Sequence, residues 1–234
     1  MSWLSRFLQS TIGQKIVMAV TGLALVGFVI AHMLGNLQIF LNDGGDALNS
    51  YAAMLQGNQA LLWSARSVLL VSVFLHIWSA LKLTRAANSA RPISYKKKTW
   101  FGEKYAVRTM RVGGFIVLAF IVYHLLHFTV GTTHTGGYQH CNTIDDVFTC
   151  YAYENVVNGF SNPLVGIFYV VAQIFLGMHL THGVWSMTRT LGQGNPRFDG
   201  LARKAAIGIG LAITIGNSAI PICVMAGFFK VVGG

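Results

Sequence analysis

The chain has 234 residues, of which 53% are hydrophobic and only 10% are charged, and its mean hydropathy is +0.54. Soluble domains carry about 25% charged residues, so the composition argues against a soluble protein and for a membrane protein. The formal net charge of +10 would suit nucleic-acid binding, but the basic residues flank apolar segments in a pattern that membrane topology explains better.

Five apolar segments are long enough to cross a bilayer, which takes roughly 20 helical residues. The segment that precedes them lacks the cleavage pattern of a signal peptide and is typical of an interfacial segment. The sequence therefore predicts an all-α integral membrane bundle of five transmembrane helices, with residues 1–234 forming one membrane domain. In chain order, the expected spans are Ile16–Phe40, Leu61–Leu83, Val112–Val130, Leu164–Met187 and Ala205–Phe229.

The distribution of charge predicts how the spans are oriented. Lysine and arginine gather before the first span and in the connections after the second and fourth spans, and these residues are retained on the cytoplasmic side. The connections after the first and third spans instead hold five acidic residues: Asp43, Asp46, Asp145, Asp146 and Glu154. We therefore expect a multi-pass protein of the cytoplasmic (inner) membrane with a cytoplasmic N-terminus, an external C-terminus, and lipid rather than nucleic acid around it.

Two of the three cysteines, Cys141 and Cys150, fall in the third connection, on the side expected to be oxidising. A disulfide is plausible there, and two free thiols are an equal alternative. Cys223 lies in the fifth span and is expected to pack.

Histidine is the unusual residue of the spans. A polar side chain in a membrane helix is costly and normally faces a partner inside the bundle, so a hydrogen-bonded structural role is the simplest interpretation of any single one. Six of the eight histidines lie within the expected spans: His32, His76, His124, His127, His179 and His182.

The depths of four of these histidines point to a shared role. With a rise of 1.5 Å per residue, His32 and His124 lie about 25 and 20 Å from the inner edge of the membrane. His76 and His179, counted from the outer edge, lie about 20 and 24 Å inward. The first two therefore share the outer half of the membrane and the other two share the inner half.

Two imidazoles at one depth on different helices are what the axial ligation of a haem iron requires. Bis-histidine ligation fills both axial positions, so such a haem carries electrons rather than binding oxygen. No span contains Asp or Glu, which disfavours an ion or proton pathway. Seven glycines would let a flat macrocycle approach the helices, although close helix packing explains each one as well: Gly22, Gly27, Gly35, Gly113, Gly114, Gly177 and Gly183.

Four segments carry a resemblance that covers essentially the whole chain. They read "FVIAHMLGN", "VFLHIWSALKL", "RVGGFIVLAFIVYHLLHF" and "FSNPLVGIFYVVAQIFLGMHLTHGVWS". In these segments the chain resembles the single-subunit, two-haem cytochrome b that anchors succinate dehydrogenases and fumarate reductases. The last segment is the most diagnostic.

The resemblance implies two haem b groups, an outer one held by His32 and His124 and an inner one held by His76 and His179. His127 and His182 are then neighbours of the ligands rather than ligands. The chain would be the electron-transfer and quinone-reactive subunit of an oxidoreductase. Its partners would be a flavoprotein with FAD, which holds the dicarboxylate active site, and an iron–sulfur subunit, both on the cytoplasmic side. The basic segment "SYKKKTWFGEKYAVR" would dock that partner or contact anionic lipid.

Quinone, with menaquinone expected for this kind of family, would be the membrane substrate. Asn36, Gln38 and Gln56 lie near the expected outer face and are candidate quinone contacts. Some family members that oxidise menaquinol carry glutamate where this chain has Gly177, and Gln56 stands where another glutamate is associated with quinol oxidation. The reaction direction, the quinone and the association of complexes into dimers therefore stay open.

Two other classes remain as alternatives. The first is the di-haem cytochrome b of a formate dehydrogenase or hydrogenase, and the second is a membrane transporter without haem.

Overall fold

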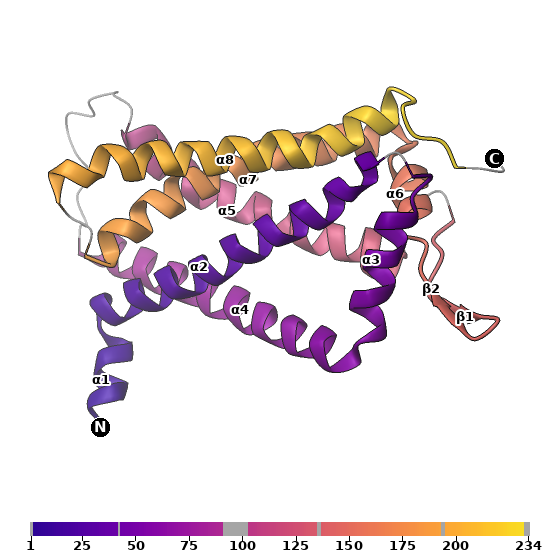
Figure 1. Ribbon diagram of the computed structural model, residues 1–234. Helices are drawn as coiled ribbons and strands as arrows, with labels where there is room; N and C mark the ends of the chain where they lie inside the picture. Colours follow the sequence, from indigo (N-terminus) through magenta and orange to yellow (C-terminus); the bar gives the residue numbers. More distant parts are fainter. Residues whose placement is uncertain (1, 42, 91–102, 135–136, 193–194, 232–234) are drawn as a thin grey trace.

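A computed structural model describes residues 2–41, 43–90, 103–134, 137–192 and 195–231, and Figure 1 shows how its helices are arranged. Five helices are long and apolar enough to cross a membrane, so the chain is an all-α, multi-pass membrane protein, as its composition predicts. Residues 91–102, which hold much of the basic segment expected to meet a partner subunit, lie outside the described residues.

The described elements include the five spans and several shorter pieces between them. A 3-10 turn, η1 (Leu37–Leu41), extends the first span, a π-helical turn, η2 (Leu126–Val130), extends the third, and β1 (Asn142–Ile144) pairs with β2 (Val147–Thr149) as an antiparallel hairpin. The helices are α1 (Trp3–Gln9), α2 (Thr11–Asn36), α3 (Asp46–Gly57), α4 (Gln59–Ser89), α5 (Glu103–Leu125), α6 (Ala152–Phe160), α7 (Pro163–Thr190) and α8 (Pro196–Met225).

Three of the spanning helices begin at an asparagine whose side chain caps the first turn. The Oδ1 atoms of Asn58, Asn162 and Asn195 each accept a hydrogen bond of 3.0 Å from a backbone N–H at the start of α4, α7 and α8. In α7 and α8 a proline follows at once, where its missing N–H costs nothing and its fixed φ suits the helix.

The fifth span begins and ends earlier than its hydropathy predicts. The expected range was Ala205–Phe229, whereas α8 runs from Pro196 to Met225. The Asn-Pro start signal determines the first turn, although its residues are polar. The helix stops before Gly227, whose φ of +78° lies in the left-handed region where a helix cannot continue.

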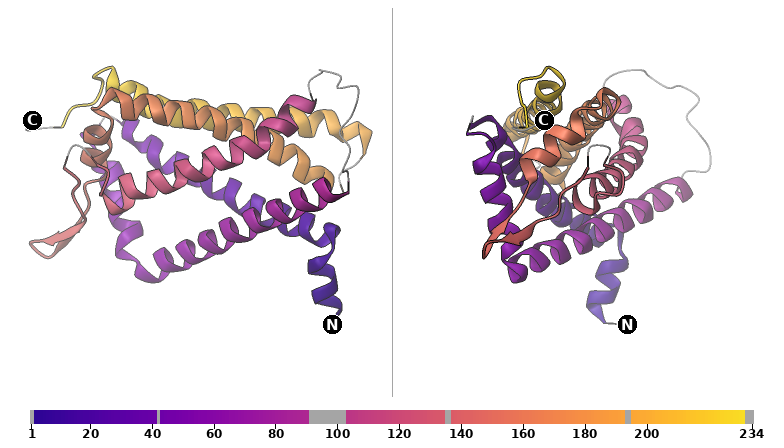
Figure 2. Two further views of the ribbon diagram at one scale, coloured as in Figure 1. Left: turned by 180° about the vertical axis from the view of Figure 1, so that it is seen from behind. Right: turned by 90° about the vertical axis from the view of Figure 1, so that its right-hand side faces the viewer.

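The spanning helices do not all pack on one another to the same extent, and α7 and α8 share the most extensive contact. The α7 and α8 backbones touch at two glycines: a Cβ added to Gly177 would lie 2.8 Å from the Gly210 carbonyl oxygen, and one added to Gly210 would lie 2.7 Å from the Gly177 carbonyl oxygen. α2 packs on α4 and α7, and α5 packs on α7. In Figures 1 and 2, α4 and α8 therefore lie on opposite sides of the bundle, with the other three spans between them.

The two ends of the bundle differ in structure. We call the end where α1 and α2 begin the N-terminal end, and the end that carries α3, α6 and the hairpin the disulfide end (Figure 1). The sequence predicts only polar connections at the disulfide end, whereas these connections fold into two helices and a hairpin. Cys141 and Cys150 form a disulfide that closes the hairpin, which resolves the alternative left open by the sequence.

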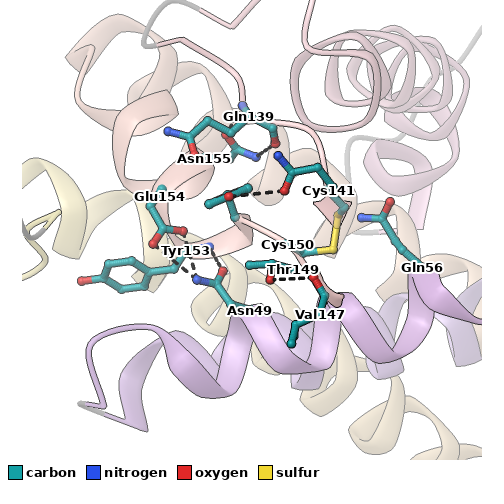
Figure 3. Close-up of a disulfide and its surroundings, with 12 residues drawn as sticks. Asn49, Gln56, Gln139, Cys141, Val147, Thr149, Cys150, Tyr153, Glu154 and Asn155 are labelled. Atoms are coloured by element: carbon teal, nitrogen blue, oxygen red, sulfur yellow. Dashed lines mark hydrogen bonds between the residues drawn. A yellow bond between two sulfur atoms is a disulfide. The ribbon is translucent and has the colours of Figure 1, made fainter. Parts of the chain in front are cut away.

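We call α3, α6 and the hairpin, which lie at the disulfide end, the cap. Polar contacts hold the cap together, and Figure 3 shows several of them around the disulfide. The Asn49 side chain in α3 accepts a hydrogen bond of 2.8 Å from the Tyr153 N–H of α6 and donates one of 3.0 Å to the Glu154 carboxylate. The buried Asn155 amide exchanges two hydrogen bonds of 2.8 Å with the Gln139 backbone. The segments between spans are thus fixed to one another.

Candidate functional site

The structure brings four of the span histidines together as two pairs, and these are the pairs expected from their depths. The ring centroids of His32 in α2 and His124 in α5 are 5.8 Å apart. Those of His76 in α4 and His179 in α7 are 6.4 Å apart. Each of the first four spans therefore contributes one imidazole, and α8 contributes none.

The helices that carry each pair are not direct packing neighbours. α2 makes its main contacts with α4 and α7, while α5 packs on α7 alone among the other described spans. The imidazoles of each pair thus meet across the interior between helices, rather than at a helix–helix seam. All four rings are half-buried. The helices α2, α4 and α7 contain no Asp or Glu, and the acidic residues of α5 and α8, Glu103 and Asp199, lie in the first turn of each helix.

One imidazole of the second pair is held in a defined tautomer. His76 Nδ1 lies 3.1 Å from the Met18 carbonyl oxygen and 3.3 Å from the Thr21 hydroxyl. Because a carbonyl only accepts, Nδ1 carries the hydrogen and donates it to Met18. Nε2 of this neutral ring then keeps a free lone pair, which is the arrangement found in metal-binding histidines.

The opposite ring supplies an unsatisfied nitrogen. His179 Nδ1 is buried and has no hydrogen-bond partner among the described residues. A buried polar atom normally finds a partner, and in a native protein an exception usually marks a functional group or a bound molecule. In this pair, His76 Nε2 and His179 Nδ1 are therefore both without a hydrogen-bond partner in the part of the protein that the structure describes, and could bind another group.

The spacing of the rings fits a shared metal ion. Two imidazoles on opposite sides of one metal, with bonds of about 2.0–2.1 Å, have ring centroids roughly 6 Å apart. The observed 5.8 and 6.4 Å agree with that distance. Two protein ligands at each level are the number that a haem iron takes in bis-histidine ligation, so the residues present fit this group.

The glycines expected beside a macrocycle fall into three groups. A Cβ added to Gly22 would lie 3.3 Å from His76 Cε1, and one added to Gly114 would lie 3.8 Å from His179 Cε1, so both glycines border the second pair. The Tyr51 ring packs against Gly35, and α8 packs against Gly177, so these two glycines allow close helix packing. An added Cβ would meet nothing within 4 Å at the other three, Gly27, Gly113 and Gly183.

His127 stands apart from the pairs because the helix changes its winding there. The π-helical turn η2 begins at Leu126, so His127 does not simply lie one α-helical turn beyond His124 on the same face. His127 is fully buried, its Nδ1 is 2.9 Å from the Tyr169 hydroxyl, and its ring lies 5.1 Å from that of His134.

Tyr169 of α7 joins His127 to the first pair. Its hydroxyl oxygen lies 2.9 Å from His127 Nδ1 and 3.4 Å from His124 Nδ1. If His124 keeps the lone pair of Nε2, its Nδ1–H donates to the tyrosine oxygen and the tyrosine O–H donates to His127. The sequence does not single out this residue, because "GIFYVVAQIF" shows only an apolar span, with nothing to say which side of the helix the ring occupies.

His182 lies one turn from His179 towards the N-terminal end. It is half-buried, and its ring centroid is 6.2 Å from that of Trp185. The Trp185 indole N–H donates to Asp199, which also forms an ion pair of 3.1 Å with Arg189. His182 therefore lies between His179, one turn away, and a polar cluster at the membrane edge.

The three candidate quinone contacts lie at the disulfide end but do not form one hydrogen-bonded group. Asn36 ends α2, Gln38 lies in η1, and Gln56 lies in α3 beside the disulfide (Figure 3). No hydrogen bond joins their side chains in the part of the chain that the structure describes. They remain predicted contacts.

One tyrosine outside the spans secures the segment after η2. The Tyr138 hydroxyl donates a hydrogen bond of 2.8 Å to the Phe128 carbonyl oxygen. Burial raises the pKa of this phenol, because it disfavours the charged phenolate, so Tyr138 stays a hydrogen-bond donor at neutral pH.

Comparison of the chain with protein-family models, with curated proteins and with solved structures finds no match. The residues and their geometry are therefore the basis for assigning a function.

Proposed function

We propose that this protein is a membrane cytochrome b that carries electrons through two bis-histidine haems. The observation that carries the proposal is the pairing of four imidazoles from four different spans, at ring distances of 5.8 and 6.4 Å. His32 and His124 would hold one haem, and His76 and His179 the other. When bound, two such haems supply one-electron carriers at two depths in the membrane.

The protein's own residues would orient these ligands. The Met18 carbonyl accepts from His76 Nδ1 and leaves the Nε2 lone pair free. The Tyr169 hydroxyl, 3.4 Å from His124 Nδ1, would do the same for His124. Such partners raise the basicity of a ligating imidazole. They also fix its ring orientation, which would otherwise change by rotation about χ2.

The resemblance of the four histidine segments supports a narrower proposal about partners. The chain would anchor an iron–sulfur subunit and an FAD flavoprotein of a succinate:quinone oxidoreductase, with the N-terminal end on the cytoplasmic side. Oxidation of succinate to fumarate releases two electrons and two protons, and reduction of a quinone to a quinol takes up two of each, so the reaction balances in either direction. Quinone, expected to be menaquinone, would exchange electrons at the disulfide end.

The first test is a pyridine haemochrome assay with haem counted per polypeptide. We expect two b haems in the wild type and a loss of about half or more of the haem in His32→Ala, His76→Ala, His124→Ala and His179→Ala. His182→Ala is the matched control, because it removes an imidazole one turn from His179 on the same helix, and it should keep both haems. A folded wild-type chain without haem, or equal haem loss in the His179 and His182 variants, would refute the proposal.

A second test addresses the partners. The chain is isolated under mild conditions with whatever it binds, and covalent or tight flavin is measured together with haem reduction by succinate. Flavin and succinate-dependent reduction support the narrower proposal. Haem that is reduced by formate or hydrogen but not by succinate would support instead the cytochrome b of another quinone-linked dehydrogenase.

A further inference from the structure

A pocket of about 350 Å³ opens at the N-terminal end, between α1, α2 and α4. Leu75 and Trp78 of α4 form part of its apolar wall. Gln14 of α2, together with Ser79 and Lys82 of α4, contributes polar groups. No histidine lines it, so the pocket is separate from the two imidazole pairs.

Two polar atoms in the wall of this pocket are buried without a hydrogen-bond partner among the described residues. They are Gln14 Oε1, on a side chain that is 6% exposed, and Ser79 Oγ, on a side chain that is fully buried. The Gln14 amide nitrogen donates to the Leu8 carbonyl, which fixes the amide orientation and leaves Oε1 as a free acceptor. Both side chains line the pocket, so a molecule seated there could supply the missing partners for one acceptor and one hydroxyl.

The charge around the pocket is positive. Lys82 lies in its wall, Arg6 follows the lining residue Ser5, and Lys15 follows Gln14. The sequence has no Asp or Glu before Asp43 and none in α4, so no carboxylate on α1, α2 or α4 balances these cations. Among the described residues Lys82 forms no ion pair. The electrostatics therefore favour an anion.

An apolar surface leads away from the pocket towards the middle of the membrane. Along α4, Leu70, Phe74 and Trp78 are 65%, 65% and 54% exposed, and the rings of Phe74 and Trp78 stack at 6.2 Å. α4 makes its main contacts with α2 and α3, so this face is open to hydrocarbon. A molecule that filled the pocket could lay a chain along it.

We propose that this pocket binds one anionic phospholipid whose headgroup carries a hydroxyl group, of the phosphatidylglycerol class. The phosphate accepts from the Lys82 ammonium, and a headgroup hydroxyl donates to Gln14 Oε1. The Ser79 hydroxyl donates to a phosphate or ester oxygen, and an acyl chain lies against Phe74 and Trp78. Basic pockets between membrane helices are known to take anionic headgroups, and here the unsatisfied acceptor adds a preference for a hydroxyl donor.

The test is native mass spectrometry of the whole chain in detergent, titrated with three lipids of equal chain length. Phosphatidylglycerol has the charge and the hydroxyl, phosphatidylethanol has the charge without the hydroxyl, and phosphatidylcholine has neither. We expect one retained phosphatidylglycerol, with phosphatidylethanol about fivefold weaker because one hydrogen bond is lost. Phosphatidylcholine should be weaker again. Free glycerol 3-phosphate should not compete, because it lacks the acyl chains.

Variants connect the binding to the pocket. Lys82→Gln and Ser79→Ala should each weaken phosphatidylglycerol about fivefold, which is the effect of one charge near a membrane surface or of one hydrogen bond. Ser64→Ala is the matched control on α4, because its hydroxyl is exposed and already bonded to the Ala60 carbonyl. Lys204→Gln is the control for charge.

The proposal is overturned if the three lipids bind alike, or if the pocket variants match their controls. It is also overturned if a short-chain menaquinol displaces phosphatidylglycerol and binds equally well to Lys82→Gln, since the pocket would then be a site for an uncharged ring. The haem count is recorded in parallel and is expected to be the same in every variant. Failure of this proposal is therefore distinguishable from failure of the cytochrome assignment.

Discussion

At the scale of single residues, the structure adds orientation to what the sequence says about depth. Counting residues along a helix gives the height of each histidine, and this was enough to predict which histidines face one another. Height alone says nothing about the direction in which a side chain leaves the helix. Tyr169 therefore could not be predicted, although its hydroxyl lies between His124 and His127.

The Tyr169 hydroxyl gives a prediction about haem retention. We expect Tyr169→Phe to keep the haem of the His32–His124 pair but to bind it about 10–100-fold more weakly, the usual cost of removing the partner of a ligating histidine. The measurement is transfer of haem to an excess of an apo-globin acceptor. Tyr123→Phe is the control, since it removes the same group from the neighbouring ring, 6.0 Å away. Equal effects would show that Tyr169 acts only by packing.

The choice between His124 and His127 shows a limit of sequence reasoning at this scale. The two residues are separated by three positions in an apolar run, so a regular α-helix would place them on the same face. The π-helical turn at Leu126–Val130 breaks that regularity, and His127 is buried beside Phe128 and His134 instead of facing His32. Nothing in "HLLHFTV" signals the change of winding.

At the scale of helices, the contact between α7 and α8 is the most extensive among the described helices. It depends on the absence of side chains at Gly177 and Gly210, each of which faces the other's carbonyl oxygen. In the family that the histidine segments resemble, some members that oxidise menaquinol have a glutamate at the position that corresponds to Gly177. In this chain the position faces Thr214 and the α8 backbone, so a glutamate side chain has no room there.

This helix contact gives a prediction about stability. Gly210→Ala should lower the thermal midpoint, because its Cβ would press on Thr181 and on the Gly177 carbonyl oxygen, and overpacking of this kind costs about 1–3 kcal/mol. Gly208→Ala, two residues away, would meet nothing within 4 Å and should be neutral or slightly stabilising. Scanning calorimetry or a thermal shift assay in detergent compares the two. A Gly210 variant as stable as the Gly208 variant would contradict the packing described.

A second prediction at this scale concerns the cap at the disulfide end. Asn49→Ala leaves the Tyr153 N–H and the Glu154 carboxylate without their partner, which costs about 1–3 kcal/mol for a group kept from water. We expect faster hydrogen exchange in peptides from α6, and no change in those from α8. Asn142→Ala is the control, because Asn142 is exposed and its one side-chain hydrogen bond is long, at 3.4 Å. Unchanged exchange in α6 would show that other contacts hold this helix.

At the scale of the whole molecule, hydropathy was sufficient to predict five spanning helices and insufficient to predict what joins them. The spans follow from length and apolar content, which are local properties. The helices α3 and α6 and the hairpin depend on contacts between segments more than 100 residues apart, such as Asn49 with Tyr153. The helix ends differ for another reason, since local capping asparagines and prolines set them rather than the apolar run itself.

The disulfide between Cys141 and Cys150 has a consequence for how the chain is made. The two cysteines lie between α5 and α7, and disulfides persist only in an oxidising compartment. If this segment lies on the outer, oxidising side, as the charge distribution predicts, the bond forms only after the segment has crossed the membrane, and its oxidised state then reports completed translocation. Thiol alkylation of denatured chains taken from cells should then label Cys223 alone, and all three cysteines after reduction. If Cys141 and Cys150 are labelled without reduction, then the segment never leaves the reducing side and the orientation proposed here is inverted.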